Sequence, residues 1–190
     1  MVFPVSLKIF CVYMKKIGLL SDTHGYLDYD ILDFFEPVDE VWHAGDIGTE
    51  DVLDALEARK PVRAVFGNCD GWGIRMRTTE IERFTVEGLD VLMTHIGGYP
   101  GRYEYKINEI MKVLPPKLFI SGHSHILKIV NDKKYNLLHI NPGAAGRMGI
   151  HRTMTCVRFD IDNGVVKNLE LFEKFYELPS LVDAKNHHHI

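Results

Sequence analysis

The stretch MKKIGLLSDTHG at residues 14–25 decides the fold. Its apolar run KIGLL, residues 16–20, is short and stops at Ser21, a pattern typical of a buried strand that ends in polar residues. Apolar residues then recur at helical spacing over residues 31–35. The folded part of the chain is therefore predicted to begin with a strand that is followed by a helix.

The next segments continue this alternation. The run EVWHA at residues 40–44 predicts a second strand, and residues 50–59 place their apolar side chains on one face of a helix. The run VRAVF at residues 62–66 predicts a third strand. A β-α-β-α-β start implies parallel strands that are joined by right-handed crossovers.

The second half of the sequence is predicted to be richer in hairpins. It contains one further helix at residues 104–114 and one further single strand at residues 117–121. The expected hairpins pair 82–87 with 90–95 around Gly88-Leu89, 126–130 with 135–140, and 153–161 with 165–172. The sheets must then be partly parallel and partly antiparallel. We expect an α/β fold, namely a four-layer α/β/β/α sandwich with two mixed β-sheets.

The 190 residues fit one domain, which we place at residues 14–178. Residues 1–13 are apolar, but Lys8 interrupts them and no cleavage site follows, so we expect an N-terminal extension, with an extra edge strand as the alternative. Residues 179–190 include three adjacent histidines and are expected to form a C-terminal tail rather than a metal site.

Composition limits the classes of function. The formal net charge is −4 and no cluster of Lys and Arg occurs, so general nucleic-acid binding is not expected. The three cysteines are widely spaced, which favours a reducing cytoplasm over a disulfide framework. No apolar run reaches the roughly 18 residues of a membrane span. Self-association is left open.

Five polar segments each follow a predicted strand, and each contains a residue type that binds metals. They are Asp22-Thr23-His24, Gly45-Asp46, Gly67-Asn68-Cys69-Asp70, Thr94-His95 and Gly122-His123-Ser124-His125. Open α/β sheets place their ligands at the carboxyl ends of strands. One such segment alone is weak evidence, but five in this placement predict a metal site.

The donors in these segments are carboxylate and amide oxygens together with imidazole nitrogens. This set suits Mn, Fe, Zn or Ni, whereas the lack of thiolate pairs argues against structural zinc. The segments contain seven predicted ligands, which are too many for one tetrahedral ion and suit two ions that share a carboxylate. They are Asp22, His24, Asp46, Asn68, His95, His123 and His125. Two ions about 3.5–4 Å apart form the usual clamp for in-line attack on phosphorus.

The order D-x-H, GD, GN, H and G-H-x-H resembles the calcineurin-like metallophosphoesterase superfamily. The variant GNCD, the small size and Asn141-Pro142-Gly143 resemble its compact bacterial and archaeal phosphodiesterase branch, which is related to the retromer subunit Vps29. The likeness spans residues 16–172. It implies a phosphoesterase that hydrolyses a small phosphodiester with a hydroxide activated between two divalent ions. Manganese is the metal expected first, and nickel, iron, zinc or magnesium are the alternatives.

The resemblance also implies a role for each ligand. One metal is expected on Asp22, His24, Asp46 and His125, and the other on Asp46, Asn68, His95 and His123. Asp46 is expected to bridge the two ions. The amide NH₂ of Asn68 is left free to donate to a phosphate oxygen.

Two alternatives stay open at this stage. A Vps29-like protein would be a non-catalytic scaffold that binds other proteins, and a relative of another branch would be a phosphomonoesterase or nucleotidase. The seven filled ligand positions favour an enzyme. Many relatives have GNHD, but here Cys69 replaces the histidine, so the group that protonates the leaving oxygen is unassigned.

Other polar residues are interpreted more simply. Arg102 follows His95 in a glycine-rich loop and is either a substrate contact or a solvated side chain. His43 and His139 lie on predicted strands and are expected to be packed. The sequence alone assigns no role to Arg147, His151 and Arg152.

Overall fold

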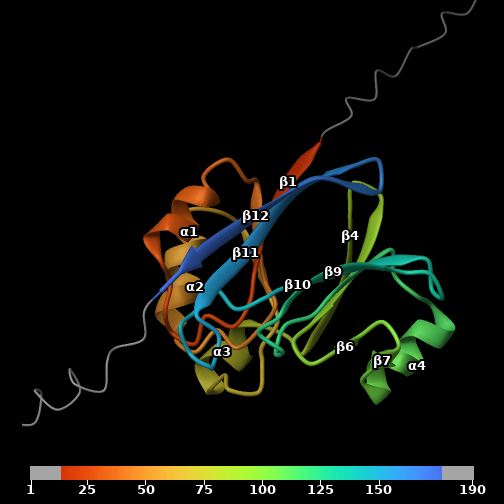
Figure 1. The fold of residues 1–190 in the computed structure, drawn as a ribbon, viewed down its shortest axis with the longest axis horizontal. Coiled ribbons are helices and arrows are strands. Elements are labelled where there is room, and N and C mark those ends of the chain that lie inside the picture. Colours follow the sequence, from red (N-terminus) through yellow and green to blue (C-terminus); the bar gives the residue numbers. More distant parts are fainter. Residues whose placement is uncertain (1–13, 177–190) are drawn as a thin grey trace, which may run out of the picture.

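The computed structural model describes residues 14–176 and shows two β-sheets that pack face to face (Figure 1). Each sheet contains five strands and is mixed. The expected extension at residues 1–13 and the tail at residues 179–190 lie outside the described residues. Within residues 14–176, no helix has the length and apolar character that would let it cross a membrane.

The first sheet has the order β12-β11-β1-β2-β3. Its strands are β1 Lys15–Leu20, β2 Glu40–His43, β3 Val62–Ala64, β11 Thr153–Asp162 and β12 Val165–Phe175. The first three strands are parallel, and helices α1 Tyr29–Phe34 and α2 Glu50–Glu57 connect them. The predicted β-α-β-α-β start is therefore confirmed. Strand β11 then returns antiparallel to β1.

The second sheet has the order β4-β5-β8-β10-β9. Its strands are β4 Ile81–Val86, β5 Leu89–Thr94, β8 Leu118–Ile120, β9 Leu127–Asp132 and β10 Leu137–Pro142. Helix α4 Tyr105–Val113 connects β5 with its parallel neighbour β8. The three predicted hairpins are present as β4-β5, β9-β10 and β11-β12.

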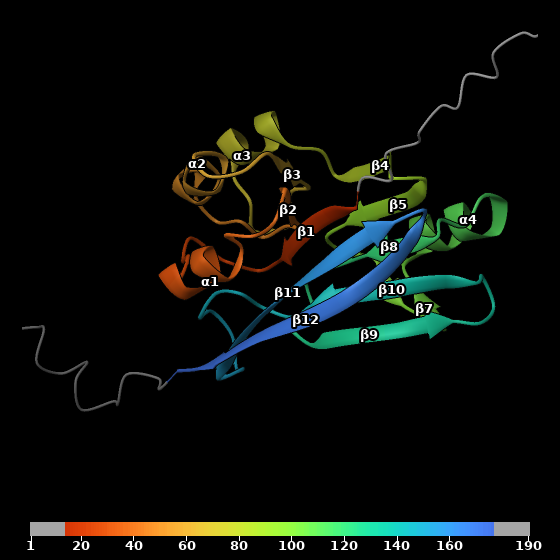
Figure 2. The same cartoon turned by 90° about the horizontal axis from the view of Figure 1, so that it is seen from above.

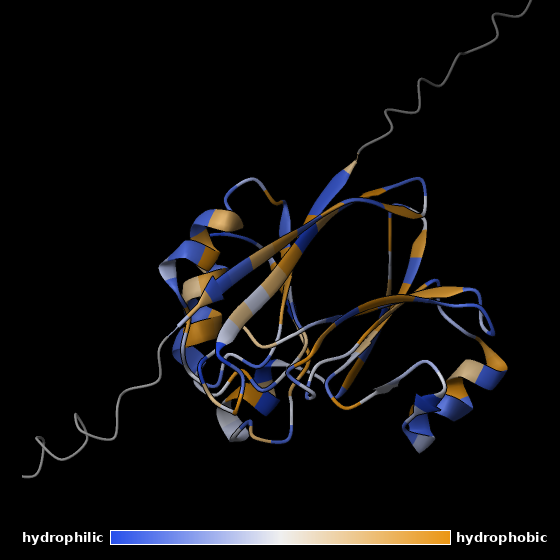
Figure 3. Ribbon diagram, viewed as in Figure 1, coloured by the Kyte–Doolittle hydropathy of each residue, from blue (hydrophilic) through white to orange (hydrophobic). Residues whose placement is uncertain are grey.

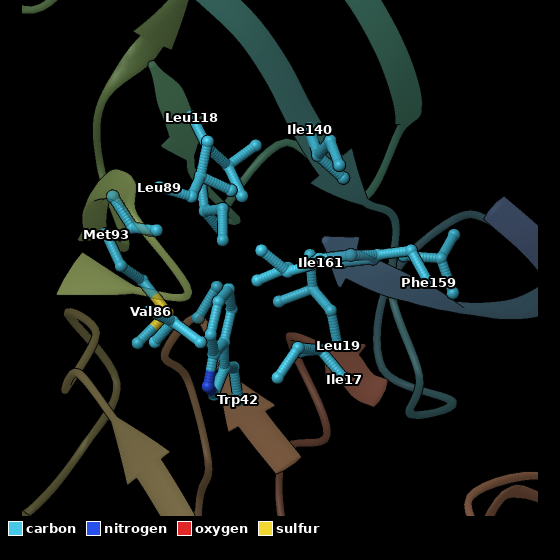
Figure 4. Close-up of a cluster of buried hydrophobic side chains, with 14 of the residues drawn as sticks. Ile17, Leu19, Trp42, Val86, Leu89, Met93, Leu118, Ile140, Phe159 and Ile161 are labelled. Carbon is cyan, nitrogen blue, oxygen red and sulfur yellow. The ribbon is translucent and has the colours of Figure 1, made fainter. Parts of the chain in front are cut away.

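Three hydrophobic clusters hold the layers together. The central cluster fills the space between the sheets, with Ile17 and Trp42 facing Met93 and Leu118 (Figure 4). A second cluster joins the first sheet to α1 and α2, and a third joins the second sheet to α4 (Figure 2). Apolar and polar residues alternate along helices and strands accordingly (Figure 3). The predicted four-layer sandwich is confirmed.

Three short elements and one turn differ from the prediction. Helix α3 Trp72–Arg77 and the two-residue strands β6 Gly98–Tyr99 and β7 Arg102–Tyr103 were not predicted. The β4-β5 turn consists of Glu87 and Gly88, both at positive φ, so the predicted Gly88-Leu89 turn is displaced by one residue. The physical reason is burial, because the side chain of Leu89 packs in the central cluster.

Candidate metal centre

The predicted ligands lie in loops at the carboxyl ends of β1, β2, β3, β5 and β8. Most of these loops bend sharply, because five predicted ligands adopt the left-handed backbone region that non-glycine residues seldom occupy. They are Asp22 (φ 55°), His24 (φ 48°), Asp46 (φ 51°), His123 (φ 67°) and His125 (φ 56°). Such conformations persist where surrounding contacts impose them, and they gather at functional sites.

Backbone hydrogen bonds impose these conformations. The amide of Asp22 donates to the carbonyl of Gly45 (2.9 Å), and the amide of His24 donates to the carbonyl of Asp46 (3.0 Å). The amide of His123, from the other sheet, donates to Oδ2 of Asp22 (3.1 Å). The loops of the two sheets are thus tied to each other.

One group of donors consists of Asp22, His24 and His125, whose ligand atoms all lie within 4.8 Å of one another. Nε2 of His125 lies 3.2 Å from Oδ1 of Asp22 and 3.2 Å from Nε2 of His24. Two nitrogens and a carboxylate oxygen therefore converge on one point. This arrangement suits a borderline divalent cation.

A second group consists of Asp46, His95 and His123. Oδ2 of Asp46 lies 3.2 Å from Nε2 of His95 and 3.9 Å from Nε2 of His24, so Asp46 lies between the two groups. Asn68 is exposed and, with His95, borders a hollow beside this group. The structure thus brings all seven predicted ligands to one end of the sandwich.

Two buried atoms show that the site fits a cation. Oδ1 of Asp22 and Nε2 of His95 are inaccessible to solvent, and neither has a hydrogen-bond partner among the described residues. An unsatisfied polar atom costs free energy when it is buried, and metal coordination relieves that cost. The oxygen and nitrogen donors around these atoms are those that divalent ions prefer.

The two carboxylates give the site a negative potential. Burial by itself would raise the pKa of Asp46, but the adjacent imidazole of His95 and a hydrogen bond from the amide of Cys69 outweigh it and hold that pKa far below its usual range. The neighbouring carboxylate of Asp22 raises the pKa of His125, and this effect outweighs burial. Asp46 is therefore an anion at neutral pH, and the site attracts positive charge.

Buried residues behind the ligands orient them. The Nδ1–H of His95 donates to the carbonyl of Ala44 (2.9 Å), which leaves Nε2 directed at Asp46. His43 is buried as predicted, and its Nε2–H donates to Oγ1 of Thr23 (2.9 Å). Burial lowers the pKa of His43 to about 4, so its imidazole is neutral at pH 7.

His151 lies behind His125. The sequence alone assigned it no role. Its Nε2–H donates to the carbonyl of Gly146 (3.1 Å), and its Nδ1 lies 3.3 Å from Nδ1 of His125. Nδ1 of His151 is then an acceptor for the Nδ1–H of His125, which leaves Nε2 of His125 free to bind a cation. The 26-residue separation of the two histidines gave no sequence signal for this contact.

Arg75 is a second residue that the sequence analysis missed. Its guanidinium donates to the carbonyls of Gly67 (2.9 Å) and Asp70 (2.8 Å), and it borders the same hollow as Asn68 and His95. The exposed side chain of Arg102 lies on β7, and within residues 14–176 no hydrogen bond or ion pair joins it to a predicted ligand. Its role as a substrate contact stays a prediction.

Comparisons with known proteins identify the family of the chain. The calcineurin-like phosphoesterase superfamily domain matches residues 14–164. A probable metallophosphoesterase of Methanothermobacter thermautotrophicus is 31% identical over 136 residues, which cover 67% of this chain and 76% of the relative.

Two solved structures share the fold. A novel archaeal phosphodiesterase superposes with a TM-score of 0.66 at 22% identity and covers 84% of this chain and 99% of its own. Vacuolar protein sorting 29 of Cryptosporidium parvum superposes with a TM-score of 0.62 at 14% identity and covers 86% of this chain and 100% of its own. Similarity at these identities concerns the fold alone.

Proposed function

The chain belongs to the calcineurin-like phosphoesterase superfamily, and on that premise we propose that it hydrolyses a small phosphodiester with the help of two divalent ions. The observation that carries the proposal is the convergence of two donor groups on Asp46. The fold shared with an archaeal phosphodiesterase is consistent with a diester substrate, and the comparison of two esters described below decides between diester and monoester. The free thiols of Cys69 and Cys156 fit a reducing cytoplasm.

The residues divide between the two ions as follows. Asp22, His24 and His125 would hold one ion, His95, His123 and Asn68 would hold the other, and Asp46 would contact both. The mixed set of carboxylate, amide and imidazole donors is compatible with manganese, which we expect first, and with nickel, iron, zinc or magnesium. When bound, two such ions supply a hydroxide nucleophile at neutral pH and offset the charge that develops on the phosphoryl oxygens.

The protein's own groups position the substrate and stabilise its negative charge. The exposed amide of Asn68 presents Nδ2–H₂ as a donor to a phosphate oxygen. His43 and His151 keep Thr23 and His125 in place. Partial burial and the carboxylate of Asp46 raise the pKa of the Cys69 thiol, so it stays protonated at pH 7 and is a weak donor to a leaving oxygen.

A scaffold of the Vps29 kind is the alternative that the structural similarity raises. That similarity rests on the fold, whereas the six predicted ligands in the two donor groups and their two unsatisfied buried atoms concern metal binding directly. Stripping the protein of metal, loading it with manganese and measuring metal content by elemental analysis tests the centre. We expect two ions per chain, and fewer than one would contradict the proposal.

Activity is measured on the same preparation with bis(p-nitrophenyl) phosphate and p-nitrophenyl phosphate. A higher kcat/KM for the diester supports a phosphodiesterase, and a higher value for the monoester reassigns the chain to the phosphomonoesterases. Two bound ions without hydrolysis of either ester would favour the scaffold. Protein kept in chelator is the control for hydrolysis that does not depend on metal.

A further inference from the structure

Two hollows open beside the second donor group. The Tyr99 hollow has a volume of about 210 Å³, and its walls include Ile96, Tyr99, His123, Ile126, Lys128 and His139. The Arg75 hollow has a volume of about 280 Å³, and its walls include Phe66, Asn68, Arg75, Glu80, His95 and Ile96. Ile96 borders both hollows. Each hollow is also lined by predicted ligands of the second ion, namely His123 in the Tyr99 hollow and Asn68 and His95 in the Arg75 hollow.

We propose that the Tyr99 hollow is the subsite for one ester arm of the diester, and that the arm it accepts carries an aromatic or heteroaromatic ring. This inference rests on the proposed function and names the substrate class more closely. The Arg75 hollow, on the other side of Ile96, leaves separate room for the second arm.

The position of the Tyr99 hollow supports the proposal. His123 lies both in its wall and in the second donor group, so the hollow begins where the phosphate would be held. A diester carries two substituents on phosphorus, and the metal centre is bordered by two hollows. A monoester would leave one of them empty.

The size of the hollow also supports a single ring. Sites for whole drug-sized ligands usually measure about 300–1,000 Å³. A space of about 210 Å³ is smaller, so it suits one substituent rather than a complete substrate.

The chemistry of the walls favours a ring. Tyr99 is 37% exposed and Ile126 is 63% exposed, so both offer apolar surface to an incoming group. The ammonium of Lys128 lies 3.8 Å from the centre of the Tyr99 ring, and this contact holds the phenol in place. An aromatic arm gains contact with a positioned ring of this kind, whereas a methyl group does not.

The inner wall is polar but carries no further cation at neutral pH. His139 is buried and stacks on Phe119 with 5.3 Å between ring centroids. Burial lowers its pKa to about 4, and the nearby charge of Lys128 acts in the same direction. Lys128 and Glu104 are the other charged residues in the walls of this hollow.

The test measures binding as well as turnover. Manganese-loaded protein is titrated by calorimetry with diphenyl phosphate and with dimethyl phosphate, which differ in their rings but share the phosphate. We expect wild type to bind diphenyl phosphate more tightly, and Tyr99→Ala to weaken this binding by up to about tenfold. Tyr99→Phe keeps the ring and should bind like wild type. Tyr29→Ala removes an exposed tyrosine from α1 and serves as the matched control.

Kinetics with bis(p-nitrophenyl) phosphate provide the second readout, because the Tyr99 hollow then receives a ring in either orientation of the substrate. We expect Tyr99→Ala to raise KM with little change in kcat. Equal affinity of wild type for both phosphates, or an equal loss in Tyr29→Ala, would overturn the inference. If the protein binds diphenyl phosphate through Tyr99 but hydrolyses no diester, the proposed function fails while the subsite stands.

Discussion

Asp46 occupies the position where the two donor groups meet. Its Oδ2 faces His95 and His24, and its Oδ1 accepts a hydrogen bond from the amide of Cys69 (2.8 Å). A carboxylate shared by two cations offsets the repulsion between them. Loss of its charge should therefore affect both ions, whereas the loss of any other ligand affects one.

Asp46→Asn should abolish turnover while the fold survives. Asparagine tolerates the left-handed conformation that Asp46 adopts, and its carbonyl oxygen can still accept from Cys69. Turnover of bis(p-nitrophenyl) phosphate, elemental analysis and circular dichroism measure the three effects. Asp33→Asn, on the exposed face of α1, is the matched control. Activity within about tenfold of wild type would exclude the bridging role.

With a thiol at position 69, the rate should depend steeply on the acidity of the leaving group. General-acid help is typically worth about 10²–10⁴-fold in rate, and a thiol with a raised pKa supplies little of it. A series of diesters with graded leaving-group pKa should therefore give a steep dependence in wild type. Cys69→His should speed the poor leaving groups more than the good ones, and Cys69→Ser should change little. A shallow dependence, with chemistry rate-limiting, would mean that another group donates the proton.

At the scale of elements, the sequence predicted the strands and helices that have a clear period or sharp ends. Short apolar runs that stop at polar residues predicted the ends of β1, β2 and β8 to within two residues. Helix α3 was not predicted because its six residues include a glycine and only Ile74 is buried, so the sequence shows no apolar face there. The two-residue strands β6 and β7 are too short to show any alternation.

The candidate site was more predictable than its surroundings. The candidate ligands could be proposed because each follows a strand, and strand ends can be recognised locally. The contact of His151 depends on how two loops 26 residues apart pack, which no local pattern records. The same holds for β11, since its hairpin was predicted but its place beside β1 was not. Arg75 was missed because it lies on α3, which was not predicted.

Strand β10 carries a pH-dependent contribution to stability through His139. Its pKa of about 4 in the folded protein lies below the ordinary value of 6.5, so between these pH values the unfolded chain binds more protons. This contribution is complete above pH 6.5 and is lost as the pH falls toward 4, by up to about 3 kcal/mol. Chemical denaturation in chelator at several pH values should therefore show a weaker fall for His139→Phe than for wild type. Parallel curves would contradict this.

The whole molecule joins two sheets, and the candidate metal centre lies across them. The first sheet supplies Asp22, His24, Asp46 and Asn68, and the second supplies His95, His123 and His125. Bound ions would therefore link the sheets at the end where these loops meet, in addition to the central hydrophobic cluster. A ligand that binds only the folded state stabilises it by mass action.

Metal removal should accordingly destabilise the whole sandwich. Each ion at a hundred times its dissociation constant contributes about 2.7 kcal/mol, which corresponds to a Tm shift of about 5–10 °C per ion for a chain of this size. Calorimetry with manganese and with chelator measures that shift. Hydrogen exchange adds the sharper test, because the loops after β1 and β8 belong to different sheets and should both gain protection when metal binds. His95→Ala should reduce the gain on both sides, since loss of one ligand loosens the link for both sheets. Protection confined to one sheet would show that the ions do not join the two.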